Sequence, residues 1–309
     1  MGTRVDYPLL AVTLILVGVG LLIVSSASIV ISDRNFGTIY HYSLRHVIYA
    51  ALGLLLLFFT SRIPYKIWKK LALPLMVIAL ALTALVFLPT IGLRHGGAAR
   101  WLDLGFLSFQ PSEFLKIVLI LYLASWLSKK QQEAKDTQRA FLPFVVILGI
   151  VSVFLIMQPD IGTLIVVAFT ATILYFLGGG KIHQLASLGL LGAVAMFVLV
   201  QLAPYRLNRF LVFLTPGLDP GGVGYHIRQA LIAIGSGGFW GRGFGQSLQK
   251  YNYLPEPIGD SIFAVTVEEF GFLGATILIG LFIFFFWRSI AIARRAPDVF
   301  SKLVVAGIA

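Results

Sequence analysis

Long runs of apolar residues, separated by short polar segments, dominate the chain. A helix needs about 20 apolar residues to cross the hydrocarbon core of a bilayer. Eight runs approach or reach that length, and the last residues, "SKLVVAGIA", have the composition of a further span at its start. The pattern predicts an all-α polytopic membrane protein with eight transmembrane helices and the start of a ninth. The eight predicted spans lie near residues 8–30, 46–61, 72–90, 112–128, 141–158, 162–178, 184–203 and 261–287.

The composition agrees with a membrane protein. Of the 309 residues, 58% are hydrophobic and 12% are charged, against about 25% charged residues in soluble domains. The mean hydropathy is +0.91. No stretch of useful length remains for a soluble domain, so we expect a single integral membrane domain over residues 1–309. The chain has no cysteine, which excludes disulfides and thiolate metal sites.

The distribution of Lys and Arg predicts the orientation of the chain in the membrane. Cytoplasmic loops are enriched in these residues. With the N-terminus inside, more than half of the 24 Lys and Arg residues fall in short inner segments, and the outer loops are longer. We therefore expect a cytoplasmic N-terminus. The net charge of +11 then reflects topology and contact with membrane lipids, and nucleic acid is not needed to explain it.

Two outer segments, 91–116 and 204–260, are longer than ordinary loops. Loops of more than about 12–15 residues are usually functional or disordered, and the many aromatic residues here argue against disorder. Residues 204–260 are predicted to form a large extracytoplasmic loop between helices 7 and 8. Within it, "YHIRQALIAIG" at 225–235 has apolar residues at helical spacing, which predicts a helix on or dipping into the membrane interface.

Three carboxylates lie at or within the last long apolar run. Ionised side chains in such a helix are costly and are usually functional. Asp260, at the mouth of the run, suits an N-cap, a general base or both. Glu268 lies about 12 Å deeper, at 1.5 Å per residue, which is too deep to act on the same atom. We expect Glu268 and Glu269 to bind buried polar groups of other helices or, alternatively, to form a proton path.

Two further polar groups lie at the ends of predicted spans. Glu113 and Lys116 are three residues apart and so share one face of a helix, where a structural ion pair is the simplest interpretation. Asp160, in "QPDIG" between two spans, favours a cap or turn.

The glycine run "GSGGFWGRGFG" at 235–245 lacks the Gly-Lys-Ser/Thr ending of a nucleotide-binding loop. We expect its glycines to let the backbone and Arg242 approach a lipid phosphate or another helix. His226, beside Arg228, could contact a phosphate, although a lone interfacial histidine is more often structural. The histidines show no metal-binding spacing.

Four segments resemble, in this order, motifs of the SEDS family, the FtsW, RodA and SpoVE proteins of bacterial division, elongation and sporulation. They are "GGAARWLDLGFLSFQPSEFLK", "QPDIGT", "GYHIRQALIAIGSGGFWGRGFG" and "YLPEPIGDSIFAVTVEEFGFLG". The resemblance covers nearly the whole chain, and four ordered motifs at matching topological positions argue against chance. It implies ten transmembrane helices, so we expect the natural protein to continue beyond residue 309.

The resemblance implies peptidoglycan glycosyltransfer at the outer face of the bacterial cytoplasmic membrane, with lipid II as substrate and release of undecaprenyl diphosphate. The essential aspartate of the family follows a Pro-Glu motif and corresponds to Asp260. Many members have Thr-Asp-Phe there, whereas this chain has Gly-Asp-Ser. By the same resemblance, Glu113, Lys116 and Asp160 shape a central cavity.

Elementary chemistry agrees with this activity. A sugar hydroxyl is a poor nucleophile, and a nearby carboxylate can take its proton during attack. The diphosphate leaving group needs cations and no general acid. A glycoside hydrolase would need a second catalytic carboxylate. A divalent cation, Mg or Mn, could assist, although no ligand set is visible. Besides Asp260 as base, the candidate substrate-binding residues are Arg100, Glu113, Lys116, Asp160, Arg206, Arg209, His226, Arg228, Arg242 and Glu256.

Within the family, "PEPIGDSIFA" and "SWLSKKQ" resemble FtsW, which implies a role in cell division. The expected partners are a class B penicillin-binding protein with transpeptidase activity, other division proteins and membrane lipids. The alternatives are a RodA-like elongation polymerase, a lipid II flippase and a non-catalytic scaffold.

Overall fold

The computed structural model describes residues 5–95, 98–103, 105, 108–133, 138–201, 212 and 222–309. The chain forms two compact units. The first comprises Met1–Arg62 and Ala195–Arg288, and the second comprises Ile63–Val194 and Ser289–Ala309.

Helices make up most of the described structure, and each predicted span contains one. Six of the described helices, α1, α3, α4, α5, α8 and α11, are long and apolar enough to cross a membrane. The apolar parts of α6 and α7 are shorter, so the count of eight spans stays a prediction. The helices are α1 (Tyr7–Ala27), α2 (Ile29–Phe36), α3 (His41–Arg62), α4 (Tyr65–Leu85), α5 (Pro111–Glu133), α6 (Gln138–Met157), α7 (Ile161–Leu177), α8 (Ile182–Gln201), α10 (Val223–Gly237), α11 (Ile262–Arg294) and α12 (Val299–Ile308).

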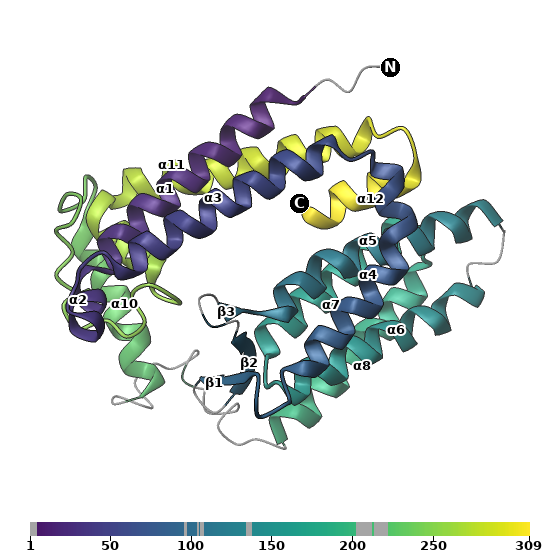
Figure 1. Ribbon diagram of the computed structural model, residues 1–309, viewed down its shortest axis with the longest axis horizontal. Helices are drawn as coiled ribbons and strands as arrows, with labels where there is room; N and C mark the ends of the chain where they lie inside the picture. The colour runs from purple at the N-terminus through teal and green to yellow at the C-terminus, as the bar shows by residue number, and fades with distance from the viewer. Residues whose placement is uncertain are drawn as a thin grey trace. The chain divides into compact units, whose positions relative to one another are not determined.

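The first unit contains α1, α3 and α11 (Figure 1). Helix α1 contacts α3, and two side-chain ties join α1 to α11. At the start of α1, Asp6 accepts a hydrogen bond from the N–H of Leu9 (3.0 Å) and forms a bidentate ion pair with Arg288 (3.0 and 2.8 Å). Near the end of α1, Ser26 Oγ donates to the Glu269 carboxylate (2.6 Å). These ties, one near each end of α1, hold the two helices antiparallel.

The long helix α11 is broken at Gly271, whose φ of 67° and ψ of −168° are not helical. Such a break frees two carbonyls before it and two N–H groups after it, and in an apolar segment each must find a partner. The glycine-rich segment 238–243 provides all four partners. Arg242 and Gly243 donate N–H groups to the carbonyls of Glu268 and Glu269 (3.0 and 2.9 Å), and Gly238 and Phe239 accept from the N–H groups of Phe272 and Leu273 (2.9 and 3.2 Å).

Three glycines allow this close approach of two backbones. A Cβ at Gly237 would collide with the carbonyl of Val267, and a Cβ at Gly241 would collide with that of Glu269. A Cβ at Gly271 would collide with the backbone N of Gly241. The glycine run therefore lets the backbone approach another helix, which is one of the two uses expected for it.

The second unit is organised around α5, which contacts α4, α7 and α12. Leu115 and Leu123 on α5 are fully buried. At the start of α4 and α12, the ring of Phe300 stacks on Tyr65 at 6.4 Å, and the Lys69 ammonium lies 5.7 Å above the Phe300 ring. The apolar helix predicted to begin near the end of the chain, α12, is thus packed into this unit.

A small antiparallel sheet stands between α4 and α5, in a region where no strand was predicted. Its order is β1 (Gly92–His95), β2 (Ala98–Asp103) and β3 (Ser108–Phe109), with a bulge between Leu93 and Arg94. The strands are short and glycines lie around them, so their sequence does not show the alternation of apolar and polar residues that is typical of a strand. The predicted helical membrane fold is confirmed, and this small sheet is an addition in the loop between two of its helices.

Replacing Gly271 with alanine should destabilise the protein strongly. A residue with a Cβ is strained in this region of φ and ψ by about 1–3 kcal/mol, and the collision with Gly241 adds to that. We expect a melting temperature in detergent lower by several degrees, measured by thermal unfolding. Gly280 lies in the same helix with open space around it, so Gly280→Ala is the matched control and should leave the melting temperature unchanged or higher.

Candidate active site

Asp260 lies at the end of the loop that joins α10 to α11. Its side chain is exposed and forms no hydrogen bond or ion pair with the residues that the structure describes. The N-cap interpretation of Asp260 is wrong, because α11 begins at Ile262 and the carbonyl of Ser261 accepts the hydrogen bond from the N–H of Val265 (3.2 Å). The carboxylate is thus left free to bind a ligand.

The residue next to Asp260 is held from two sides. Ser261 Oγ donates to the carbonyl of Pro255 (2.8 Å) and lies 2.5 Å from His226 Nε2 on α10. A hydroxyl has one proton, and that proton is used toward Pro255, so His226 must donate from Nε2. His226 therefore positions the backbone beside Asp260, and this contact agrees with a structural histidine.

Glu256 forms the turn that precedes Asp260. Its φ of 47° is in the left-handed region, which is uncommon for residues other than glycine, asparagine and aspartate. Its carbonyl accepts hydrogen bonds from the N–H groups of Gly259 (3.0 Å) and Ser261 (3.2 Å). Backbone strain of this kind persists only where the surroundings impose it. The turn therefore fixes the backbone on both sides of Asp260.

The loop is anchored below this turn by apolar packing. Leu254 is buried in a cluster formed with Ala27 at the end of α1, Ala233 on α10, and Ala264 and Val265 on α11. Burying one leucine side chain is worth about 1.5–3 kcal/mol. Leu254 therefore ties the loop to three helices of the first unit.

Glu268 binds the same loop from inside α11. It is completely buried. Its carboxylate accepts hydrogen bonds from Ser247 Oγ (2.5 Å), the N–H of Leu248 (3.0 Å) and the N–H of Gln249 (3.3 Å). Arg242 Nε lies 3.7 Å away. Glu268 thus stabilises a turn of the loop in the way that an acidic N-cap stabilises a helix.

Glu269 forms a buried ion pair with Lys250, at 2.9 Å. Lys250 is 1% exposed and Glu269 is 2% exposed. The Lys250 ammonium also donates to Ser26 Oγ (2.9 Å) and to the carbonyl of Gly245 (2.8 Å). The expectation that Glu268 and Glu269 bind buried polar groups is confirmed. Most of these groups belong to the loop, however, and Ser26 on α1 is the partner from another helix.

Lys250 was not among the residues singled out from the sequence as candidates for the site. A lone lysine in a loop of a basic protein carries no local signal of burial. Its partners Ser26 and Glu269 are 224 and 19 residues away along the chain, so only the folded chain brings them together.

The candidate cations of the first unit differ in their surroundings. Arg228 on α10 is exposed and forms no hydrogen bond or ion pair with the described residues. Arg242 is 38% exposed and faces Glu268. Arg206 and Arg209 lie outside the described residues. Arg228 is therefore the described arginine of this unit that is most free to bind an anion.

Arg100 lies on β2 in the second unit, and its guanidinium binds backbone carbonyls of the same unit. Its Nε donates to the carbonyl of Gln158 (3.2 Å), and a terminal nitrogen donates to the carbonyl of Pro159. Both carbonyls follow the end of α6. The guanidinium therefore satisfies the carbonyls at a helix C-terminus, where a positive charge is favourable.

Asp160 is the N-cap of α7, where Oδ1 accepts a hydrogen bond from the N–H of Thr163 (3.3 Å). The cap predicted for this residue is confirmed. The side chain is 6% exposed, and Oδ2 has no partner among the described residues. The amide oxygen of the neighbouring Gln158 is also buried without such a partner.

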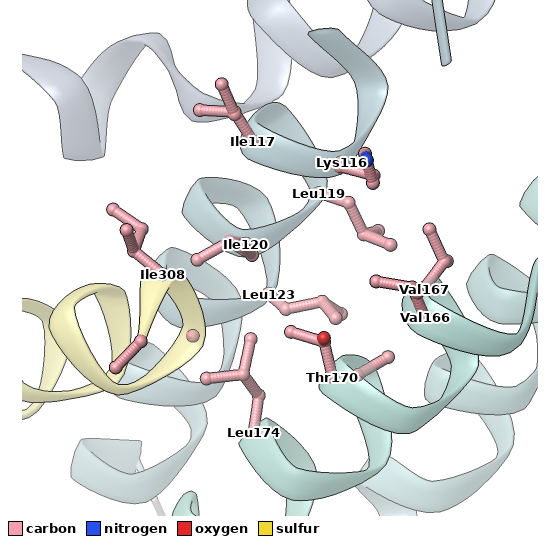
Figure 2. A pocket seen from close by; sticks show the side chains of 13 residues that line it. Lys116, Ile117, Leu119, Ile120, Leu123, Val166, Val167, Thr170, Leu174 and Ile308 are labelled. Atoms are coloured by element: carbon pink, nitrogen blue, oxygen red, sulfur yellow. The ribbon is translucent and has the colours of Figure 1, made fainter. Parts of the chain in front are cut away.

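Glu113 and Lys116 form the predicted ion pair, with Nζ and Oε1 2.9 Å apart in the first turns of α5. Lys116 also lies at one end of an apolar groove of about 310 Å³. Figure 2 shows side chains of α5, α7 and α12 pointing into it, among them Leu123, Leu174 and Ile308.

Protein ligands for a metal ion are not gathered in the described part of the chain. No group of three or more His, Asp or Glu side chains lies close enough together there to hold an ion. The Mg or Mn ion considered from the sequence therefore stays an untested prediction.

The chain is similar to known proteins over nearly its whole length. A family model described as "Cell cycle protein", that of FtsW, RodA and SpoVE, matches residues 7–309. A protein of Coxiella burnetii named "Probable peptidoglycan glycosyltransferase FtsW" is 44% identical, over 96% of this chain and 81% of its own length. Stage V sporulation protein E of Bacillus subtilis is 41% identical, over 99% of this chain and 84% of its own length.

Solved structures show the same fold. The rod shape determining protein RodA of Thermus thermophilus has a TM-score of 0.68 and 27% identity, over 99% of this chain and 81% of that chain. A structure titled "Structural coordination of polymerization and crosslinking by a peptidoglycan synthase complex" has a TM-score of 0.77 and 28% identity, over 99% of this chain and 83% of that chain.

The helical membrane fold and the free Asp260 carboxylate on a fixed loop define the class of protein. It is an integral membrane protein with a polar site next to the end of a membrane helix. Within that class, the chain belongs to the FtsW/RodA/SpoVE family.

The effect of substitutions at Glu256 on stability should depend on whether the new residue tolerates a positive φ. Glycine adopts a positive φ without strain, whereas a β-branched residue costs about 1–2 kcal/mol there. We expect Glu256→Gly to keep the melting temperature and Glu256→Val to lower it by several degrees. Gln246, exposed with an ordinary φ, provides the control, since valine should be tolerated there at least as well as glycine. Equal effects of glycine and valine at Glu256 would contradict the imposed turn.

Proposed function

We propose that this chain polymerises peptidoglycan glycan strands from lipid II at the outer face of the cytoplasmic membrane, with Asp260 as the general base. The observation that carries the proposal is the state of the Asp260 carboxylate. It is exposed and unpartnered among the described residues, while the backbone around it is fixed by Glu256, Ser261 and Leu254. A free carboxylate on a fixed backbone is what proton transfer from a substrate hydroxyl requires.

The reaction joins two lipid-linked sugars. Asp260 removes the proton from the acceptor hydroxyl as its oxygen attacks the anomeric carbon of the donor, and the bond from that carbon to the diphosphate breaks. The electron pair leaves with undecaprenyl diphosphate, which cations stabilise. Arg228 is available for this role in the first unit, and Arg242 lies on the same loop as Asp260. A divalent cation, Mg or Mn, would stabilise the same leaving group if bound beside the diphosphate.

Buried Glu268 and Glu269 also bear on the choice between an enzyme and a flippase. A proton or substrate path needs carboxylates that face a polar passage. Both carboxylates are instead buried and hydrogen-bonded to the loop and to Ser26. Their bonding supports a structural role, and it leaves Asp260 and Glu256, in the loop before α11, as the exposed acids of this motif.

Orientation and partners follow from the charge pattern and from the relatives. The basic inner loops support a cytoplasmic N-terminus and an extracytoplasmic Asp260. The similarity to proteins named FtsW supports a role in division rather than elongation, with other division proteins as partners. The similar structure of a peptidoglycan synthase complex supports a class B penicillin-binding protein as the crosslinking partner.

Removal of the Asp260 carboxylate should abolish polymerisation without unfolding the protein. A general base typically contributes about 10²–10⁴-fold to a rate, so we expect Asp260→Asn and Asp260→Ala to lower kcat by about 100-fold or more. The protein, co-purified with a class B penicillin-binding protein, is supplied with lipid II, and glycan chains are resolved by gel.

Asp33, an exposed carboxylate on α2 of the same unit, provides the matched control, and Asp33→Asn should retain full activity. If the Asp260→Asn variant made as much polymer as the wild type, the role of Asp260 as general base would be refuted. Movement of lipid II across vesicles without polymer would favour the flippase.

Arg228 should affect substrate binding more than turnover. A hydrogen bond to a charged group is worth about 1.5–3 kcal/mol, so Arg228→Gln should raise the KM for lipid II about tenfold. Arg34, exposed on α2, is the control, and Arg34→Gln should leave KM within about twofold of wild type. An unchanged KM in the Arg228 variant would remove this residue from the site.

A further inference from the structure

The geometry points to Lys250 and Glu269 as positioning residues for Asp260. We infer that their buried ion pair, joined to Ser26, selects the one conformation of the loop in which Asp260 is placed for proton transfer. The inference rests on the proposed function, and it assigns a role to a buried lysine that the proposed chemistry does not use.

Burying the Lys250–Glu269 ion pair costs free energy, so a contribution to folding stability does not explain well why the pair is present. Moving two charges out of water costs free energy that their attraction often only balances, and apolar residues of similar volume can be as stable or more so. Both Lys250 and Glu269 are at least 98% buried. A directional role, which apolar side chains could not fill, explains the pair better than stability does.

That directional role is visible in the partners of the ammonium group. Lys250 Nζ donates to Glu269 on α11, to Ser26 on α1 and to the carbonyl of Gly245 in the loop, at 2.8–2.9 Å. Ser26 Oγ itself donates to the same oxygen of Glu269 (2.6 Å). Three separate segments are thus held in one hydrogen-bond arrangement, with all three ammonium protons used.

A short chain of contacts leads from Lys250 to Asp260. The carbonyl of Gln249, the residue before Lys250, accepts a hydrogen bond from the N–H of Leu254 (2.9 Å), and Leu254 is buried in the apolar cluster. The next residue, Pro255, accepts the Ser261 hydroxyl proton (2.8 Å). A shift of Lys250 would therefore be transmitted to the backbone that carries Asp260.

The first unit offers a matched control pair. Arg288 and Asp6 also join α11 to α1, through a bidentate ion pair. They lie near the opposite end of α1 from Ser26, away from the loop. Breaking either pair should weaken the unit, but only the Lys250–Glu269 pair should affect the placement of Asp260.

The test compares single and double variants of the polymerase with its penicillin-binding protein partner. Lys250→Met leaves Glu269 buried and unpaired, so we expect a lower melting temperature and a kcat lower by about 10- to 100-fold, the size of effect that misplacement of a catalytic group produces. The KM for lipid II should stay within about twofold, because Arg228 is untouched.

The double variant Lys250→Met/Glu269→Gln removes both charges and separates stability from positioning. We expect its melting temperature to recover toward wild type while kcat stays low, because the three-way arrangement is still absent. Arg288→Met should show the reverse, a lower melting temperature with wild-type kcat. Recovery of both melting temperature and kcat in the double variant would show a merely structural pair and overturn the inference.

A second readout does not depend on activity. The chain has no cysteine, so a single Tyr253→Cys, at a position 58% exposed in the loop, can carry a nitroxide label. We expect a more mobile spectrum after Lys250→Met and in the double variant, and no change in a label at Tyr40→Cys between α2 and α3. An unchanged Tyr253 label would overturn the inference.

The two readouts separate failure of the inference from failure of the proposed function. Absence of polymer from the full-length wild-type protein with its partner would refute the proposed function, while the label would still report whether Lys250 holds the loop. Polymerisation by the wild type together with normal kcat in Lys250→Met would refute the positioning role alone.

Discussion

The break of α11 at Gly271 is the constraint on which the first unit depends. An apolar helix can be interrupted only if the backbone groups that the break exposes find partners within the protein. The segment 238–243 provides those partners, and it can approach closely enough because Gly237 and Gly241 have no side chain. The start of the loop between α10 and α11 is therefore fixed by the backbone of α11 itself.

Glu268 and Glu269, which directly precede the break, hold the rest of the loop in place. Glu268 satisfies N–H groups of the turn at 247–249, and Glu269 holds Lys250. Charges that would be costly in an apolar helix are stable here because each is matched by donors from the loop. The loop ends at Asp260, just before α11, and the Asp260 carboxylate is exposed and without a partner among the described residues.

The sequence determined the features that depend on neighbours along the chain. The apolar runs predicted the helices, because hydrophobic length is a local property. The same holds for the cap at Asp160 and for the ion pair between Glu113 and Lys116, in which the partners are three residues apart. The order of four motifs also sufficed to indicate the family. The strands between α4 and α5 were missed because their pattern is too short to be periodic.

Only the tertiary structure decided which distant groups pair. Ser26 and Glu269 are 243 residues apart in sequence, and Arg100 meets carbonyls 58 and 59 residues away. No local pattern distinguishes a buried lysine such as Lys250 from an exposed one, nor a glycine that breaks a helix from one that packs against lipid. These properties arise from the approach of separate segments, and the free energy of each contact depends on a partner that the local sequence does not identify.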